Sequence, residues 1–455
     1  MGLELQRFDT RFRSQSSELA NLIWLSGILY FSAATGPRSR IGTILTPPSS
    51  GLEDDRMRGA RSWAAVVCLA LLLAATDSIS NPPKASPEPI RLGMSTALSG
   101  PAKELGENVR AGVLAALDEA NRSGGIGGQA LTLLALDDQY EPSRTVPNMR
   151  KLIGQEQVVA IVGNVGTPTA VAALPIANET KTPFFGAFTG AGILRKTPPD
   201  RYVVNYRASY AEETAAMVDA LIEQQGLSPS EVAFFTQRDA YGDAGFVGGI
   251  AALQRHGLAS ENQIAHGRYE RNTLAVEDAL AEIMSADPTP RAVIMVGAYE
   301  PCARFIELAR DFGLDALFLN VSFVGAAPLA AALGELGNGV IVTQVVPHLE
   351  SNLKLVREFR EALTAWMPSA TPTFGSLEGY AATRILLLAL SHIEGPITRE
   401  SVIDALEGLG AFDLGLGVPL SLSASQHQAS HTVWPTVLHA GTLRPLEWTS
   451  LRGQP

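Results

Sequence analysis

Two loops of the sequence carry hydroxyl side chains beside small residues, a pattern suited to binding an anion. The loop 163–169 follows an apolar run and presents Thr167, and the loop 186–191 follows the next apolar run and presents Thr189. Hydroxyl groups beside the free N–H groups at the start of a helix can hold a carboxylate, because the helix dipole favours negative charge there. In the alternative interpretation each threonine only caps its helix, as threonine commonly does. Both interpretations stay open at this point.

Two tyrosines follow apolar runs in the second half of the chain. They are Tyr241, in Asp239-Ala-Tyr-Gly, and Tyr299, in Gly297-Ala-Tyr-Glu-Pro. In a cleft, such rings stack on the apolar part of a ligand or donate a hydrogen bond through the hydroxyl. The alternative is an ordinary half-buried tyrosine at each position.

Other arrangements point less clearly to chemistry. His427 and His431 have a metal-ligand spacing for a helix, but their segment is predicted as a hairpin or loop. We expect Asp137 and Asp138, at a strand end, to fix a loop through backbone N–H groups rather than to bind a cation. The sequence has neither a G-x-x-x-x-G-K-[ST] phosphate loop nor a G-x-S-x-G nucleophile motif. We therefore predict no catalytic site, no metal and no cofactor.

Strands and helices alternate along the chain and position these loops. Short apolar runs with helices between them predict parallel βαβ units, whose ligands bind beyond the carboxyl ends of the strands. From residue 412 onwards the chain is typical of β-hairpins. Strands are predicted at 90–95, 131–135, 158–162, 183–185, 231–236, 292–296 and 316–320. Helices are predicted at 109–121, 147–154, 170–179, 213–225, 244–256, 275–286, 301–312, 359–366 and 375–395.

Composition limits the class of protein. A chain of 455 residues, 46% hydrophobic and 18% charged, indicates a folded protein of two lobes. The net charge of -11, without Lys/Arg clusters, argues against nucleic acid as a partner.

Residues 57–80 have the pattern of a secretory signal peptide, with arginines, an apolar run and then small residues. We therefore expect a periplasmic protein. A lipoprotein anchor at Cys68 is the weaker alternative, because Val67 rather than a small residue precedes it. Residues 1–56 do not fit the pattern, and we interpret them as a mis-annotated or disordered extension before a true start at Met57. The alternative is a membrane-anchoring helix at residues 19–31, within the apolar stretch 19–34. The mature chain would keep one cysteine, Cys302, which we expect to be a buried spectator.

Seven stretches, in order, resemble the substrate-binding proteins of branched-chain amino acid ABC transporters, of the leucine/isoleucine/valine type. The resemblance runs from about residue 90 to about residue 448. The stretches are Thr96-Ala-Leu-Ser-Gly-Pro, Asn121-Arg-Ser-Gly-Gly-Ile-Gly-Gly, Leu136-Asp-Asp-Gln-Tyr-Glu-Pro, Gly163-Asn-Val-Gly-Thr-Pro-Thr, Asp239-Ala-Tyr-Gly, Gly297-Ala-Tyr-Glu-Pro and Ser376-Leu-Glu-Gly-Tyr.

The resemblance implies an α/β fold of the periplasmic-binding-protein type I. Two Rossmann-like lobes with parallel sheets would be joined by a three-stranded hinge, crossed near Arg207, Val345 and Phe412. Lobe 1 would comprise 88–207 plus 345–412, and lobe 2 would comprise 208–344 plus 413–450. In such proteins the first lobe grips the ligand and the second closes over it.

The resemblance also implies a ligand site. Thr167 and Thr189, with their backbone N–H groups, would hold a carboxylate, and the Ala187 carbonyl would accept from an amino group. Tyr241 and Tyr299 would close from the second lobe. The whole predicted set is Ser99 at the entrance, Val165, Gly166, Thr167, Ala187, Phe188, Thr189, Tyr241, Tyr299, Glu300 and Ser322.

The sequence departs from the leucine-binding pattern at three positions. Ser322 stands where such proteins carry an acid for the ligand's ammonium, and an unpaired buried ammonium is costly. Glu300 or another acid would have to substitute. Leu105 replaces a tyrosine, and Phe188 adds bulk. The sequence therefore predicts an apolar pocket for an aromatic or aliphatic carboxylate without an amine.

We expect a monomeric transport receptor that captures a small molecule and delivers it to an ABC permease. The alternative is a ligand-binding sensor or regulator subunit of the same fold. An enzyme is the weakest interpretation, because Tyr241, Asp243 and Glu300 form no recognised catalytic set.

Overall fold

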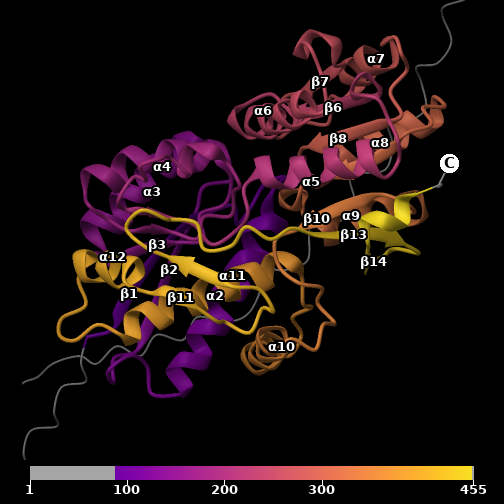
Figure 1. The fold of residues 1–455 in the computed structure, drawn as a ribbon. Coiled ribbons are helices and arrows are strands. Elements are labelled where there is room, and N and C mark those ends of the chain that lie inside the picture. Colours follow the sequence, from indigo (N-terminus) through magenta and orange to yellow (C-terminus); the bar gives the residue numbers. More distant parts are fainter. Residues whose placement is uncertain (1–87, 453–455) are drawn as a thin grey trace, which may run out of the picture. The chain divides into compact units, whose positions relative to one another are not determined.

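The computed structural model of the chain describes residues 88–452. The predicted extension (1–56) and signal peptide (57–80) lie outside the described residues. All described residues belong to one compact unit, residues 84–455. The described chain builds two large sheets and a small hairpin (Figure 1).

The first sheet has five parallel strands in the order β2-β1-β3-β4-β5. Figure 1 shows helices on both of its faces, with α3 and α4 on one side and α2 and α11 on the other. Two-sided cover explains why its inner strands are continuous apolar runs. The strands are β1 (Ile90–Thr96), β2 (Leu131–Asp137), β3 (Ala160–Val162), β4 (Phe184–Phe185) and β5 (Val203–Val204).

Helices from two separate parts of the chain cover this sheet. The helices are α2 (Lys103–Arg122), α3 (Pro142–Arg150) with a π-helical turn η1 (Lys151–Gln155), α4 (Thr167–Glu179), α10 (Lys354–Trp366), α11 (Phe374–Ser391) and α12 (Arg399–Glu407). α2 and α11 approach so closely that a Cβ at Gly112 would lie 1.8 Å from the Ser376 carbonyl oxygen. Glycine is therefore required at this contact.

The second sheet has seven strands in the order β14-β13-β10-β9-β8-β6-β7. β6 to β10 pair in parallel, and β13 and β14 add an antiparallel edge. Its strands are β6 (Val232–Gln237), β7 (His266–Tyr269), β8 (Ala292–Val296), β9 (Leu317–Asn320), β10 (Ile341–Gln344), β13 (Trp434–His439) and β14 (Thr442–Pro445). Its helices are α5 (Tyr210–Glu223), α6 (Ala240–Arg255), α7 (Glu277–Met284), α8 (Tyr299–Asp311) and α9 (Ala326–Leu333), with a 3₁₀ turn η5 (Ser322–Val324).

Three segments connect the elements of the two sheets. The first follows β5, the second follows β10, and the Tyr206 hydroxyl donates to the Val345 carbonyl at 3.0 Å to join them. The third runs beside the first, because Asn205 forms a bridge with Gln428. The sequence prediction put this third crossing near Phe412.

Phe412 instead ends β11 (Gly410–Phe412), which pairs with β12 (Leu420–Leu422) as a separate hairpin. The chain therefore reaches the first connecting segment later than the sequence suggested. We propose a third crossing at 427–430 and otherwise keep the predicted lobe limits as a proposal.

The α/β class with parallel sheets is confirmed, and most predicted elements match within a few residues. Sequence patterns missed β5, β7, β10, α9 and α12. β5 has only two residues, and the polar edge strand β7 (His-Gly-Arg-Tyr) lacks an apolar run. Such elements are defined by their neighbours rather than by their own residues.

The loop after β2 is fixed by its two aspartates, as predicted. Asp138 accepts hydrogen bonds from the Ser95 hydroxyl at 2.8 Å, the Tyr140 N–H at 3.0 Å and the Thr145 hydroxyl at 3.1 Å. Asp137 accepts from the Leu98 N–H and the Ser99 hydroxyl. Because Asp138 is buried, its pKa is raised to about 6, although these hydrogen bonds act in the opposite direction.

Two further expectations concern single features. Cys302 is fully buried and free, as expected for a spectator. Between residues 88 and 452, every helix is too short or too polar to cross a bilayer.

The tight contact between α2 and α11 gives a stability prediction. In Gly112→Ala the added methyl group clashes with backbone, so we expect a loss of about 1–3 kcal/mol in the free energy of unfolding. Gly154→Ala is the matched control, since nothing lies within 4 Å of a Cβ there. Urea unfolding of both variants checks this, and equal stabilities would contradict the contact.

The buried Asp138 gives a pH prediction. Its pKa rises from 3.8 to about 6 on folding, so its contribution to stability is complete below pH 3.8 and is lost as the pH rises through about 6. Asp138→Asn mimics the protonated group. Its carbonyl oxygen can accept from the Tyr140 N–H, and its NH2 group can donate to the Ser95 and Thr145 hydroxyls, which then act as acceptors. We expect the melting temperature of this variant to fall less than that of the wild type across this pH window. Parallel curves would show that Asp138 does not titrate in the predicted range.

Candidate functional site

The two threonine loops predicted from the sequence form one site. β3 and β4 are neighbours, and Val165 and Phe188 continue their pairing as a parallel bridge. The hydroxyl oxygens of Thr167 and Thr189 lie 2.6 Å apart, and both side chains are buried. A ligand group that met one hydroxyl would therefore lie close to the other.

The Thr189 hydroxyl accepts from the Ala191 N–H at 3.3 Å, just before a 3₁₀ turn, but Thr167 does not cap α4. Its N-cap is Gly166, and no side chain bonds to the free N–H groups of its first turn. Thr167 is the first helical residue, and the Thr169 hydroxyl donates backwards to the Gly166 carbonyl. The capping interpretation is therefore wrong for this helix. The N–H groups of Thr167 and Thr169 stay available to an anion, whereas Pro168 has no N–H and the Ala170 N–H donates to the Gly166 carbonyl.

The ring of Tyr140 determines which residue can precede the helix. Gly166 has φ +100°, and a Cβ there would lie 2.0 Å from Tyr140 Cε2. Glycine is thus required both by backbone conformation and by space. The fixed loop that holds Tyr140 and the start of α4 are consequently in contact.

Tyr210, the first residue of α5, adds an unsatisfied polar group that sequence reasoning missed. Its side chain is fully buried, and burial raises its pKa to about 12. The hydroxyl lies beside Thr189 without reaching hydrogen-bond geometry with it or with another described residue. A buried hydroxyl without a partner costs stability and is a candidate contact for a ligand.

Aromatic rings fill the space beside these groups. Phe323, in η5, is the centre of the cluster, with ring centroids 5.4 Å from Phe188, 6.0 Å from Tyr140 and 4.6 Å from Tyr241. The rings come from loops of both large sheets. A cavity of about 20 Å³, lined among others by Leu105, remains next to them, which is room for about one water molecule.

Arg207 lies at the centre of a buried charge cluster. Its guanidinium donates to Glu213 at 2.8 Å and reaches Glu378 at 3.5 Å, and it also contacts the Ser322 hydroxyl. It lies over the rings of Phe188 and Tyr210, at 5.3 and 5.5 Å from their centroids. The cluster therefore adjoins both the threonine loops and the aromatic rings.

The pKa values in this cluster follow from burial and charge. Burial raises the pKa of Glu378 to about 7, because the positive charge of Arg207 offsets only part of that effect. Burial alone would lower the pKa of Arg207, but the charges of Glu378 and Glu213 raise it above its ordinary value.

Capping boxes position the two carboxylates. Ser209 and Glu212 start α5 just before Glu213, and Thr373 and Ser376 start α11 just before Glu378. The sequence contains one signal of this pairing. Glu213 and Glu378 are acids within apolar helical faces, which is unusual unless they are paired.

Ser322, the predicted departure, contacts an acid that comes from elsewhere. Its N–H and hydroxyl donate to Glu213 at 2.8 and 3.0 Å. The Thr343 hydroxyl donates to the same carboxylate at 2.6 Å. Glu213 thus has four hydrogen-bond donors, and Ser322 helps to hold it.

The remaining predicted site residues have defined places. The Tyr299 hydroxyl donates to the Pro101 carbonyl at 2.6 Å, so α8 contacts the loop after β1. Tyr241 is buried and donates to the Gly297 carbonyl. Ser99 is tied to Asp137, and the Ala187 carbonyl accepts from the Thr189 N–H at 2.8 Å.

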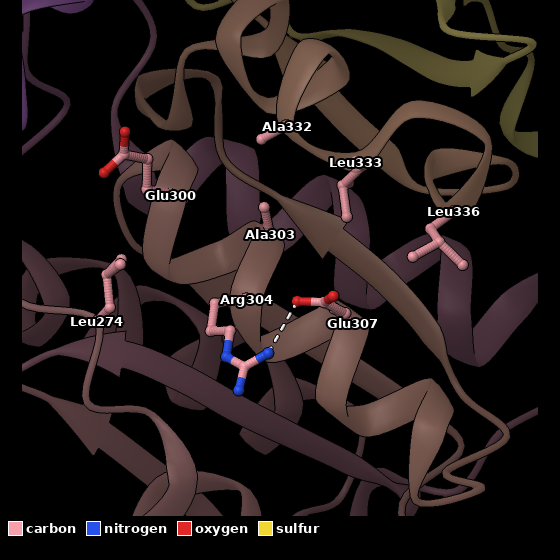
Figure 2. A pocket seen from close by; sticks show the side chains of 8 residues that line it. All are labelled: Leu274, Glu300, Ala303, Arg304, Glu307, Ala332, Leu333 and Leu336. Carbon is pink, nitrogen blue, oxygen red and sulfur yellow. Dashed lines mark hydrogen bonds and ion pairs between the residues drawn. The ribbon is translucent and has the colours of Figure 1, made fainter. Parts of the chain in front are cut away.

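Glu300 is not brought to the threonine loops. It is exposed in the first turn of α8 and lines a separate cavity of about 320 Å³ (Figure 2). Figure 2 shows its carboxylate pointing away from the Arg304–Glu307 ion pair on the same helix. The structure therefore assigns Glu300 to a cavity that contains none of the threonine-loop residues.

His427 and His431 bond to different carboxylates. His427 contacts Glu407 at 3.2 Å and the Val203 carbonyl, and His431 contacts Glu212 at 2.6 Å. These contacts fix the third connecting segment.

Comparison with known proteins agrees with the resemblance. Residues 89–442 match the periplasmic binding protein family. The solved structure of a possible leucine/isoleucine/valine-binding protein from Rhodopirellula baltica SH 1 is 54% identical, over 82% of this chain and 99% of that one, with a TM-score of 0.79. A substrate-binding periplasmic protein from Ralstonia solanacearum is 29% identical, over 78% of this chain and 99% of that one, with a TM-score of 0.72.

More distant structures share the fold alone. A branched-chain amino acid transporter substrate-binding protein from Streptococcus pneumoniae, solved with isoleucine, is 18% identical, over 78% of this chain and 97% of that one, with a TM-score of 0.66. A search of curated protein sequences found no match. The family match covers most of the chain, and the chain belongs to the periplasmic binding protein family, as a ligand-binding protein of the type I fold.

Proposed function

We propose that the chain captures a small carboxylate or amino-acid-like ligand at the Thr167 and Thr189 loops and delivers it to the permease of an ABC transporter. One observation carries this proposal. The uncapped N-terminus of α4 adjoins a buried hydroxyl pair and the unpartnered Tyr210 hydroxyl. We propose binding without catalysis, by a monomer.

The groups at this site differ in what they can offer an anion. One threonine hydroxyl donates to the other, which leaves a single hydroxyl hydrogen of the pair free. The Thr189 N–H already donates to the Ala187 carbonyl, so it is not a free donor. The N–H groups of Thr167 and Thr169, in the first turn of α4, and the Tyr210 hydroxyl complete the proposed set.

Binding has to rearrange the aromatic cluster. A cavity of about 20 Å³ admits no organic ligand, so Phe323 or the loops around it must move apart. Relative movement of two lobes around a ligand is a known way to open such a site. The rings of Phe323, Tyr241 and Phe188 would then cover the apolar part of the ligand.

Relatives support the ligand class and the transport role. The names of three similar structures refer to leucine, isoleucine or valine binding, and another is that of a fatty acid ABC transporter substrate-binding protein from Thermomonospora curvata. All of these ligands carry a carboxylate. A carboxylate site at α4 would serve either class.

We also propose export to the periplasm through the signal peptide at residues 57–80. The mature protein would then begin near Asn81. Mass spectrometry of the native protein checks this, and a peptide from residues before Met57 would contradict a start at that methionine.

Substitution of the hydroxyl pair tests the proposed site. A ligand at about 100 times its Kd stabilises a protein by roughly 2.7 kcal/mol, which a melting curve detects. We expect Thr167→Val to weaken binding about 10- to 100-fold, since a hydrogen bond to a charged group contributes about 1.5–3 kcal/mol. The panel should contain amino acids, aromatic acids, aliphatic acids and amides.

Thr182→Val is the matched control. It breaks a similar hydroxyl pair, Thr180–Thr182, 2.9 Å apart at the other end of the same helix. We expect this variant to keep the ligand response of the wild type. Equal losses in both variants, or no response of the wild type to any carboxylate, would contradict the proposal.

A further inference from the structure

We propose that Glu378 is the specificity-determining residue that selects a ligand with an ammonium group next to its carboxylate. This inference rests on the proposed function. The acid that pairs with the ligand's ammonium would then lie on α11, beside the first sheet. It would be neither at position 322, where this chain has a serine, nor at Glu300.

Glu378 faces the loop between β4 and Thr189. Residues 375, 378 and 382 lie on one face of α11, because helical neighbours recur at three and four residues. A Cβ at Gly375 would lie 4.0 Å from Phe188 Cζ, and a Cβ at Gly186 would lie 3.0 Å from Ala382 Cβ. Glu378 lies between these two contacts on α11, on the side of the helix that meets the loop 186–188.

The two buried carboxylates of the cluster differ in how well they are paired. Glu213 accepts four hydrogen bonds, at 2.6 to 3.0 Å, and has no capacity for another donor. Among the described residues, the Glu378 carboxylate has a single hydrogen-bond partner, Arg207 at 3.5 Å. Only Glu378 can therefore accept from a ligand without losing a strong hydrogen bond.

The charges of the cluster favour a cationic group. Arg207 balances one of the two carboxylates. Arg195 is the other buried cation nearby, but its donors are used by the carbonyls of Ala191 and Thr189 and by Gln428, and Glu212 lies close enough to offset its charge. One carboxylate of the group is thus without a matching cation. Burial raises the pKa of Glu378 to about 7, so this carboxyl group is partly protonated at neutral pH, and a bound ammonium would favour its ionised form.

A buried excess charge is unfavourable and attracts its opposite. An ammonium has three donors, which the Glu378 carboxylate and the Ala187 carbonyl can share. A carboxylate without an amine would add a further negative charge to the cluster. The structure therefore favours an amino acid over the amine-free acid that the sequence suggested.

Matched ligand pairs measure this selectivity. The probes are L-leucine with 4-methylpentanoate and L-phenylalanine with 3-phenylpropanoate, titrated calorimetrically into the full protein. We expect the wild type to prefer the amino acid of a pair at least about 10-fold, the lower limit for a hydrogen bond to a charged group. Glu378→Gln keeps the shape and removes the charge. It should abolish that preference by weakening the amino acid, and should leave the affinity for the amine-free acid unchanged or higher, because a negative charge is removed.

Two further variants separate this role from a structural one. Glu300→Gln is the control for the acid suggested by the sequence and should keep the preference. If Glu378→Gln does not fold, Glu378→Asp is used instead. It keeps the charge but moves the carboxylate away from the ligand by one methylene group. It should reduce the preference for the amino acid without changing the affinity for the amine-free acid.

The outcomes are distinct. Equal weakening of both ligands of a pair, or a preference that survives in Glu378→Gln, would contradict the role of Glu378. Binding of amine-free acids alone by the wild type would also contradict it, while supporting the proposed function. Binding of none of the four probes would count against the proposed function itself.

Discussion

The buried guanidinium of Arg207 is the contact on which the arrangement of the site depends. It joins Glu213 on a helix of the second sheet to Glu378 on a helix of the first, from within the first connecting segment. Removal of one partner of a buried ion pair typically costs about 3–5 kcal/mol, because the other charge is left unpaired. The ion pairs therefore hold the guanidinium in place. Because the guanidinium lies over the rings of Phe188 and Tyr210, it also positions these rings, which form the side of the site next to Thr189.

The site consequently has two poles. The uncapped start of α4, with the Thr167–Thr189 hydroxyl pair, presents partial positive charge. The Arg207 cluster presents an excess carboxylate at Glu378. The Ala187 carbonyl lies in the loop that connects them. Such a pair of poles matches a zwitterion, whose two charges are separated by one carbon atom, better than it matches a single anion.

The sequence was sufficient for what depends on local patterns. Apolar runs and helical periods identified the strands that end in the threonine loops, and the loops met as expected because β3 and β4 are neighbours. Contacts between residues that are far apart in the chain could not be predicted from the sequence. Arg207 and Glu378 are 171 positions apart, and nothing in their spacing indicates contact. Because such contacts cannot be read from the sequence, Glu300 was proposed as the acid for the ligand's ammonium and the buried Glu213 was missed. For the same reason the third crossing was placed near Phe412.

The structure of a complex tests the central claim most directly. Crystals of the protein with the amino acid that binds most tightly in the melting panel should show its carboxylate within hydrogen-bond distance of the Thr167 N–H and of a hydroxyl of the Thr167–Thr189 pair. Its ammonium should lie between Glu378 and the Ala187 carbonyl. A ligand in the cavity lined by Glu300, or one with its carboxylate away from α4, would contradict the account.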